Sequence, residues 1–207
     1  MNETIMNLTK AFIGESQARN RYTIYAKIAK NEGYEKISEI FLTTADQERE
    51  HAKWLFRMIQ DLKKNSEEDL SEIKVEATAP TAFGNTVENL KAAIGGETYE
   101  FTSMYPEFAA KAEEEGFKEI ADRLRAIAVA EKLHAGRYGW LLSELGNNTM
   151  FKKEKPVAWV CRKCGFKHEG LEALDKCPSC GHPQAYFEAV PCIPLEGEEK
   201  KECCNWG

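Results

Sequence analysis

Several features are absent from this sequence of 207 residues. It has no run of about 18 apolar residues, the length that a membrane-spanning helix requires. Its first residues lack the basic and apolar regions of a secretory signal peptide, and its net charge of -6 provides no basic surface for nucleic acid. We therefore expect a cytoplasmic protein that binds neither membranes nor nucleic acid.

Cysteine is also absent from the first 160 residues, and all seven cysteines follow that point. In a reducing cytosol, paired cysteines favour a metal site over disulfides. The composition is ordinary for a globular protein, with 43% hydrophobic and 30% charged residues. The length suits one substantial core plus a small module. The sequence therefore predicts two domains, of which only the second contains cysteine.

Apolar residues recur at helical spacing through the first domain, predicted at residues 1–146. The polar stretch 65–84 is too long for a tight turn, so we expect it to cross from one helix pair to the next. The predicted fold class is mainly α, a four-helix bundle with a crossover connection. The four helices are predicted at residues 2–31, 35–64, 85–115 and 117–145.

The two helix pairs resemble each other in sequence. The segment that begins at Gly14 recurs at Gly96, and the Glu48-x-x-His51 pair recurs as Glu131-x-x-His134, with offsets of 82 and 83 residues. Each half therefore supplies one glutamate followed by one Glu-x-x-His motif. An internal pseudo-twofold repeat is predicted.

One glutamate on each helix shares its stripe with apolar residues and is predicted to point inward: Glu15, Glu48, Glu97 and Glu131. Buried unpaired carboxylates are costly, so a cation must compensate them. In di-iron and di-manganese bundles, two helices each supply one glutamate and the other two each supply a Glu-x-x-His motif. Oxygen and imidazole ligands suit these metals. Spacing leaves open whether Glu100 faces the centre or solvent.

Four cysteines form two knuckles after the helices: Cys161-x-x-Cys164-Gly165 and Cys177-Pro178-Ser179-Cys180-Gly181. This pattern predicts a tetrahedral four-thiolate metal site, and spacing alone leaves iron and zinc open. We expect a linker at residues 147–157, a metal-binding domain of loops and short strands at 158–190, and a tail at 191–207. The role of the tail cysteines stays open: Cys192, Cys203 and Cys204.

These motifs closely resemble the rubrerythrin family, from the first helix to about Ala189. The matching segments are GESQARNRY at 14–22, EREHA at 48–52, GETYE at 96–100 and EKLHA at 131–135. The cysteine module resembles rubredoxin. The resemblance implies a ferritin-like bundle with two irons and a rubredoxin-like domain with one, which zinc can replace in recombinant protein.

The resemblance also implies the role of each site residue. Glu100 and His51 are expected to alternate at one iron, the carboxylate with ferric and the imidazole with ferrous iron. These two residues are the expected catalytic groups, together with Tyr22 and Tyr105, for which bundle packing is the alternative role. The implied metal ligands are Glu15, Glu48, His51, Glu97, Glu100, Glu131, His134, Cys161, Cys164, Cys177 and Cys180.

The function implied by the family is that of a non-haem di-iron peroxidase, which reduces hydrogen peroxide to water in protection against oxidative stress. Electrons would come from NADH through a partner reductase or rubredoxin and pass through the cysteine iron. A head-to-tail homodimer would bring one subunit's cysteine module against the other's bundle. Two alternatives belong to the bundle itself, ferroxidase or iron-handling activity and oxygen reduction. Another is an electron carrier or scaffold with zinc in the cysteines.

Overall fold

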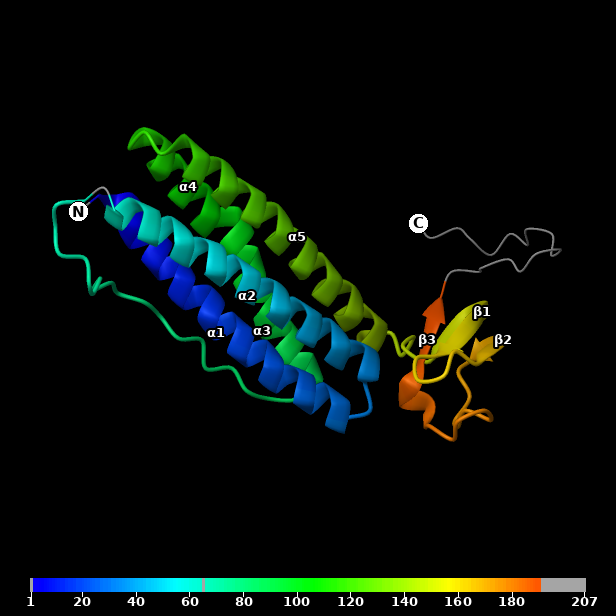
Figure 1. The fold of residues 1–207 in the computed structure, drawn as a ribbon. Helices are drawn as coiled ribbons and strands as arrows, with labels where there is room; N and C mark the ends of the chain where they lie inside the picture. The colour runs from blue at the N-terminus through cyan, green and yellow to red at the C-terminus, as the bar shows by residue number, and fades with distance from the viewer. Residues whose placement is uncertain (1, 65, 191–207) are drawn as a thin grey trace.

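The structure is a computed structural model that describes residues 2–64 and 66–190; Cys192, Cys203 and Cys204 lie outside these ranges. A helical bundle is followed by a small β-sheet beyond one of its ends (Figure 1). The predicted mainly α architecture with a small strand domain is confirmed. Within the two ranges, no helix is both long enough and apolar enough to cross a membrane. The helices are α1 (Glu3–Asn31), α2 (Glu35–Lys64), α3 (Thr86–Tyr99), α4 (Tyr105–Glu114) and α5 (Lys118–Gly146).

The bundle has four helical rods: α1, α2, α3 continued by α4, and α5. Glycine turns and side-chain caps set the ends of these rods. Gly33 and Gly116 end α1 and α4 with φ values of 86° and 87°, a backbone region that favours glycine. They occupy equivalent places in the two halves. Asn2 caps α1 by accepting a 3.0 Å hydrogen bond from the Ile5 backbone, and Asn85 caps α3 in a capping box.

The third rod is not one uninterrupted α-helix. A π-helical turn, η1 (Glu100–Met104), separates α3 from α4. The single helix expected over residues 85–115 is therefore wrong at this point. A π turn accommodates an extra residue inside a helix, and such turns often occur at functional sites. Here it contains Glu100.

Two apolar clusters fill the bundle, one toward each end. One includes Leu8, Leu55 and Leu124, and the other includes Phe41 and Leu141. On every rod, the inward glutamate lies between the stretches that contribute to the two clusters. The bundle therefore holds a layer of carboxylates between two apolar regions.

The segment between α2 and α3 runs along the outside of the bundle, as predicted for a crossover (Figure 1). Leu70 is buried against the first cluster. The Tyr25 hydroxyl donates a 2.6 Å hydrogen bond to the Ala82 carbonyl oxygen. These two contacts attach the crossing segment at both ends of its path.

The small domain is an antiparallel sheet of three strands in the order β2-β1-β3. Trp159 and Phe187 are fully buried in its core beside the cysteines. β1 begins at Lys152, so residues 152–157 of the expected linker are strand. The strands are β1 (Lys152–Cys161), β2 (Lys167–Glu172) and β3 (Phe187–Val190).

The sheet domain contacts the end of the bundle through charged groups. Glu188 of β3 lies 3.4 Å from the Lys36 ammonium of α2 and 2.8 Å from the Arg162 guanidinium. Arg162 also pairs with Glu39. The Tyr34 ring stacks on Phe151 just before β1. Residues from both domains therefore fix the position of the sheet against α2.

Candidate functional site

The carboxylate layer brings together two sets of ligand-type side chains. One set contains Glu15 and His51, and the other contains Glu97 and His134. Both sets also contain Glu48 and Glu131. Within each set, the ligand-type atoms lie within 4.8 Å of one another. Two neighbouring metal positions that share two carboxylates fit this geometry.

The histidines have matching positions on opposite sides of the shared carboxylates. His51 Nδ1 lies 2.9 Å from Glu48 Oε2 and 2.8 Å from Glu131 Oε1. His134 Nδ1 lies 3.1 Å from Glu48 Oε1 and 2.7 Å from Glu131 Oε2. Each imidazole thus lies close to one oxygen of Glu48 and one oxygen of Glu131. This symmetry follows the sequence repeat.

The layer satisfies a physical test for a metal site. Glu15 Oε2 and Glu97 Oε2 are buried without a hydrogen-bond partner among the described residues. Buried carboxylate oxygens normally have partners, and their absence requires an explanation such as an ion. Four glutamates and two histidines also form a donor set suited to iron or manganese. The residues fit a pair of such cations.

The pKa values in the layer express the same demand for positive charge. Burial and the neighbouring carboxylates raise the pKa of Glu15, and burial raises that of Glu97 to about 7. Burial alone would lower the pKa of both histidines. Attraction to the Glu131 and Glu48 carboxylates beside them outweighs it, so the pKa rises to about 9 for His51 and about 12 for His134. Without metal, protonated imidazoles provide the compensating charge.

Glu100 lies beside the two ligand sets but belongs to neither of them. Burial, then repulsion from Glu97 and Glu131, raises its pKa well above the ordinary value. His51, in contrast, is within ligand distance of the other groups, and its side chain is 15% exposed. Of the two residues expected to alternate, this structure therefore has the histidine in position.

Two buried tyrosines hold the outer glutamates in place. The Tyr22 hydroxyl donates to Glu97, and the Tyr105 hydroxyl donates to Glu15. Each tyrosine thus comes from the half of the chain opposite to the glutamate it contacts. Each hydroxyl therefore orients one glutamate of the layer, and a catalytic role for Tyr22 and Tyr105 stays a prediction.

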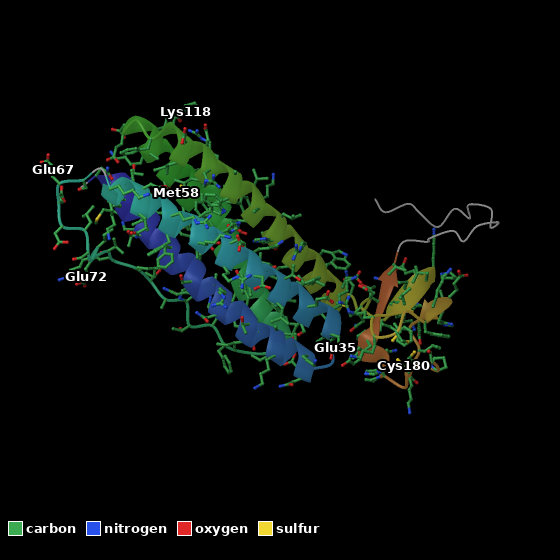
Figure 2. All side chains as sticks on the ribbon, in the orientation of Figure 1. Glu35, Met58, Glu67, Glu72, Lys118 and Cys180 are labelled. Carbon is green, nitrogen blue, oxygen red and sulfur yellow. The ribbon has the colours of Figure 1, made fainter. Side chains whose placement is uncertain are left out.

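The four knuckle cysteines gather in the sheet domain, where Figure 2 labels Cys180 beyond the end of the bundle. Cys161 Sγ lies 3.7 Å from Cys180 Sγ, and Cys164 Sγ lies 3.6 Å from Cys177 Sγ. Cys164 is exposed, whereas Cys161 and Cys177 are buried. Hydrogen bonds with the Phe166 backbone, Cys180 and Cys177 lower the Cys164 pKa to about 6. This favours the thiolate that a metal needs.

Two family models match the chain in the same two regions. The rubrerythrin model covers residues 6–142, which include the whole carboxylate layer. The model described as the rubredoxin-like domain of rubrerythrin covers residues 159–188, which include the four cysteines. The chain belongs to the rubrerythrin family.

Relatives match this rubrerythrin over nearly its full length. A protein of Methanocaldococcus jannaschii with a provisional rubrerythrin name is 64% identical, over 91% of this chain and 93% of its own. Rubrerythrin-1 of Clostridium acetobutylicum is 50% identical, over 91% and 94%. Among solved structures, fully reduced nigerythrin in its all-ferrous state is 32% identical with a TM-score of 0.60, over 90% of this chain and 86% of that one.

Residues that the sequence analysis named as ligands gather in the two regions that the family models cover. The bundle carries the di-iron site, with carboxylate and histidine donors, and the sheet domain carries the rubredoxin-like four-cysteine site. The prediction of a di-iron site in the bundle and a four-cysteine iron site in the sheet domain is thus confirmed by the family. The ferritin-like bundle is confirmed as well.

The structure also reveals residues near the di-iron site that the sequence analysis did not identify. A hollow of about 210 Å³ lies beside His51, lined by Trp54, Arg123, Ala126 and Ile127 as well. Trp54 follows His51 by three residues, so helical spacing already places both on one face of α2. No comparable pattern links Arg123 to the site, because it comes from a different helix.

Proposed function

We propose that this rubrerythrin is a non-haem di-iron peroxidase that reduces hydrogen peroxide to water and protects the cell from oxidative stress. The observation that carries the proposal is the pair of ligand sets that share Glu48 and Glu131. Two ferrous irons held there would supply the two electrons that cleave the peroxide bond. A one-electron thiolate site in the same chain suits the return of those electrons.

The proposed ligand roles follow the geometry of the layer. Glu48 and Glu131 would bridge the two positions, because each reaches both histidines. Glu15 and Glu97 would each bind one position, oriented by the tyrosine hydroxyls. His51 would yield its place to Glu100 when the site is oxidised, since Glu100 lies close enough to repel the neighbouring carboxylates. Cys161, Cys164, Cys177 and Cys180 would hold the third iron.

A head-to-tail homodimer is part of the proposal. The cysteine domain lies beyond the end of the bundle, whereas the carboxylate layer lies between the two apolar clusters (Figure 1). A second subunit could bring its cysteine domain close to this layer. Val129, Leu133 and Trp140 of α5 are 71%, 59% and 37% exposed and share one outward stripe. Exposed apolar groups in one stripe support a protein interface.

The proposed electron source is NADH, delivered by a separate reductase or rubredoxin that meets the cysteine domain in the cytoplasm. Exposure of Cys164 supports the cysteine site as the point of entry. A single turnover needs no partner protein, because chemically reduced protein already contains its electrons.

The decisive test mixes fully reduced, iron-loaded protein with peroxide under anaerobic conditions and follows absorbance by stopped flow. The peroxidase proposal expects rapid oxidation of both sites, with one electron taken per iron and two consumed per peroxide. Faster reaction with oxygen would indicate an oxidase, and faster oxidation by oxygen of ferrous iron added to the protein would indicate iron handling. Zinc in the cysteine site would prevent oxidation there and would indicate a scaffold role for that domain.

A further inference from the structure

The hollow beside His51 adjoins the carboxylate layer and is lined by the most exposed member of the two ligand sets. It lies between α2, which supplies His51 and Trp54, and α5, which supplies Arg123, Ala126 and Ile127. His51 has 15% of its side chain exposed, compared with at most 2% for the other five members of the two ligand sets. A small molecule that enters the hollow therefore reaches His51 first.

The wall of the hollow is cationic. The Arg123 guanidinium carbon lies 3.9 Å from the centroid of the Trp54 ring, and that of Arg57 lies 4.9 Å from it. A guanidinium at this distance is attracted to the ring face, which holds both arginines beside Trp54. Among residues 2–64 and 66–190, no carboxylate lies within ion-pair distance of Arg123. Its charge thus remains available to attract anions, although the chain as a whole has a net charge of -6.

We propose that this hollow is the entry port for small polar ligands and that Arg123 gives it a preference for anions. The proposal rests on the di-iron function proposed above, because it assigns a route to that site. Trp54 acts as a positioning residue that fixes Arg123. Ala126 leaves the opening wide, since its side chain ends at Cβ.

Two probes separate the effects of size and charge. Azide is an anion whose binding to the oxidised iron site is followed by absorbance. Nitric oxide is neutral, and its binding to the reduced site is followed in the same way. Association rates for both are measured by stopped flow on iron-loaded protein, at several salt concentrations. These rates report access and do not depend on catalytic turnover.

Ala126→Trp should fill the hollow and slow both probes at least several-fold. The matched control is Ala110→Trp, which places the same side chain on an exposed alanine of α4, and should leave both rates unchanged. Arg123→Gln should slow azide by roughly fivefold, weaken its salt dependence and leave nitric oxide unaffected. Arg123→Lys should retain most of the azide rate. Ala126→Leu provides a smaller obstruction if the tryptophan variant binds no iron.

The proposal is overturned if iron-loaded Ala126→Trp and Ala126→Leu both bind the two probes at wild-type rates, because the route then lies elsewhere. If Arg123→Gln changes the azide and nitric oxide rates equally, the port has no preference for anions and Arg123 has only a structural role. If the wild-type protein does not react with peroxide, only the peroxidase proposal is rejected, because the association rates of azide and nitric oxide still test the port.

Discussion

Tyr105 donates a hydrogen bond to Glu15 although 90 residues separate them in the chain. Tyr22 makes the reciprocal bond to Glu97. Tyr22 follows Glu15 by seven residues, but Tyr105 follows Glu97 by eight. The π turn η1 lies between Glu97 and Tyr105 and accommodates the additional residue. The two halves can therefore make the same bond despite their different lengths.

Replacement of Tyr105 by phenylalanine should destabilise the metal-free protein by about 1–3 kcal/mol, because buried Glu15 loses its hydroxyl donor. Urea unfolding of protein treated with a chelator measures the effect. Tyr34→Phe is the control, since its hydroxyl makes no hydrogen bond with the described residues and its ring stacking on Phe151 is retained. Equal stability of Tyr105→Phe and wild type would contradict a structural role for this bond.

Replacement of Glu131 by alanine should prevent iron binding in the bundle, because both ligand sets lose a shared carboxylate. Iron analysis should then find only the cysteine iron, with an unchanged ferric-thiolate spectrum. Glu113→Ala, at an exposed site on α4, should bind iron normally. Loss of the cysteine iron in Glu131→Ala would show that the two sites are not independent.

Replacement of Cys161 by serine should stop steady-state turnover with an external electron donor, because the relay loses one of its four thiolates. Protein reduced chemically should still complete one reaction with peroxide, since the carboxylate layer is intact. Stopped-flow absorbance and a steady-state assay on the same sample compare the two. If both reactions fail, the cysteine site has a role in the bundle beyond electron delivery.

The metal-free protein should lose stability as the pH rises from about 6.5 toward 9. The pKa of His51 is raised from 6.5 to about 9 by its carboxylate partners, although burial opposes the shift. A raised histidine pKa adds stability that is complete below the unfolded value and disappears as pH passes the folded value. Thermal melting across this range measures the loss. His51→Asn should make the profile less steep, with His134 and Glu97 still contributing, and an equally steep profile in that variant would assign the effect elsewhere.

Much of the site could be predicted from sequence because its geometry is local to each helix. Helical spacing defines the stripes that contain Glu15, Glu48, Glu97 and Glu131. The repeat relates Glu15 to Glu97 and Glu48 to Glu131, and the two ligand sets have the same correspondence. The glycine turns at Gly33 and Gly116 also brought the predicted helix ends within a few residues of those observed.

The π turn was missed because an uninterrupted period of 3.6 residues was assumed through residues 85–115. The change in repeat offset from 82 to 83 between Glu97 and Gly116 contained the information. The position of Glu100 depends on this turn, so helical spacing alone could not determine it. Arg123 was missed for another reason, because only tertiary packing brings it to Trp54 and His51. The domain boundaries and individual ligand roles stay predictions.

The two apolar clusters of the bundle meet across a polar layer, and this has a consequence for folding cooperativity. Each cluster is a separate apolar core, and the layer between them holds carboxylates whose burial and mutual repulsion raise the pKa values of Glu15 and Glu100. Metal ligands drawn from all four rods cross-link the two cores into one unit, because bound metal adds its binding energy to folding. Iron should thus change a bundle whose ends melt separately into one that melts in a single transition.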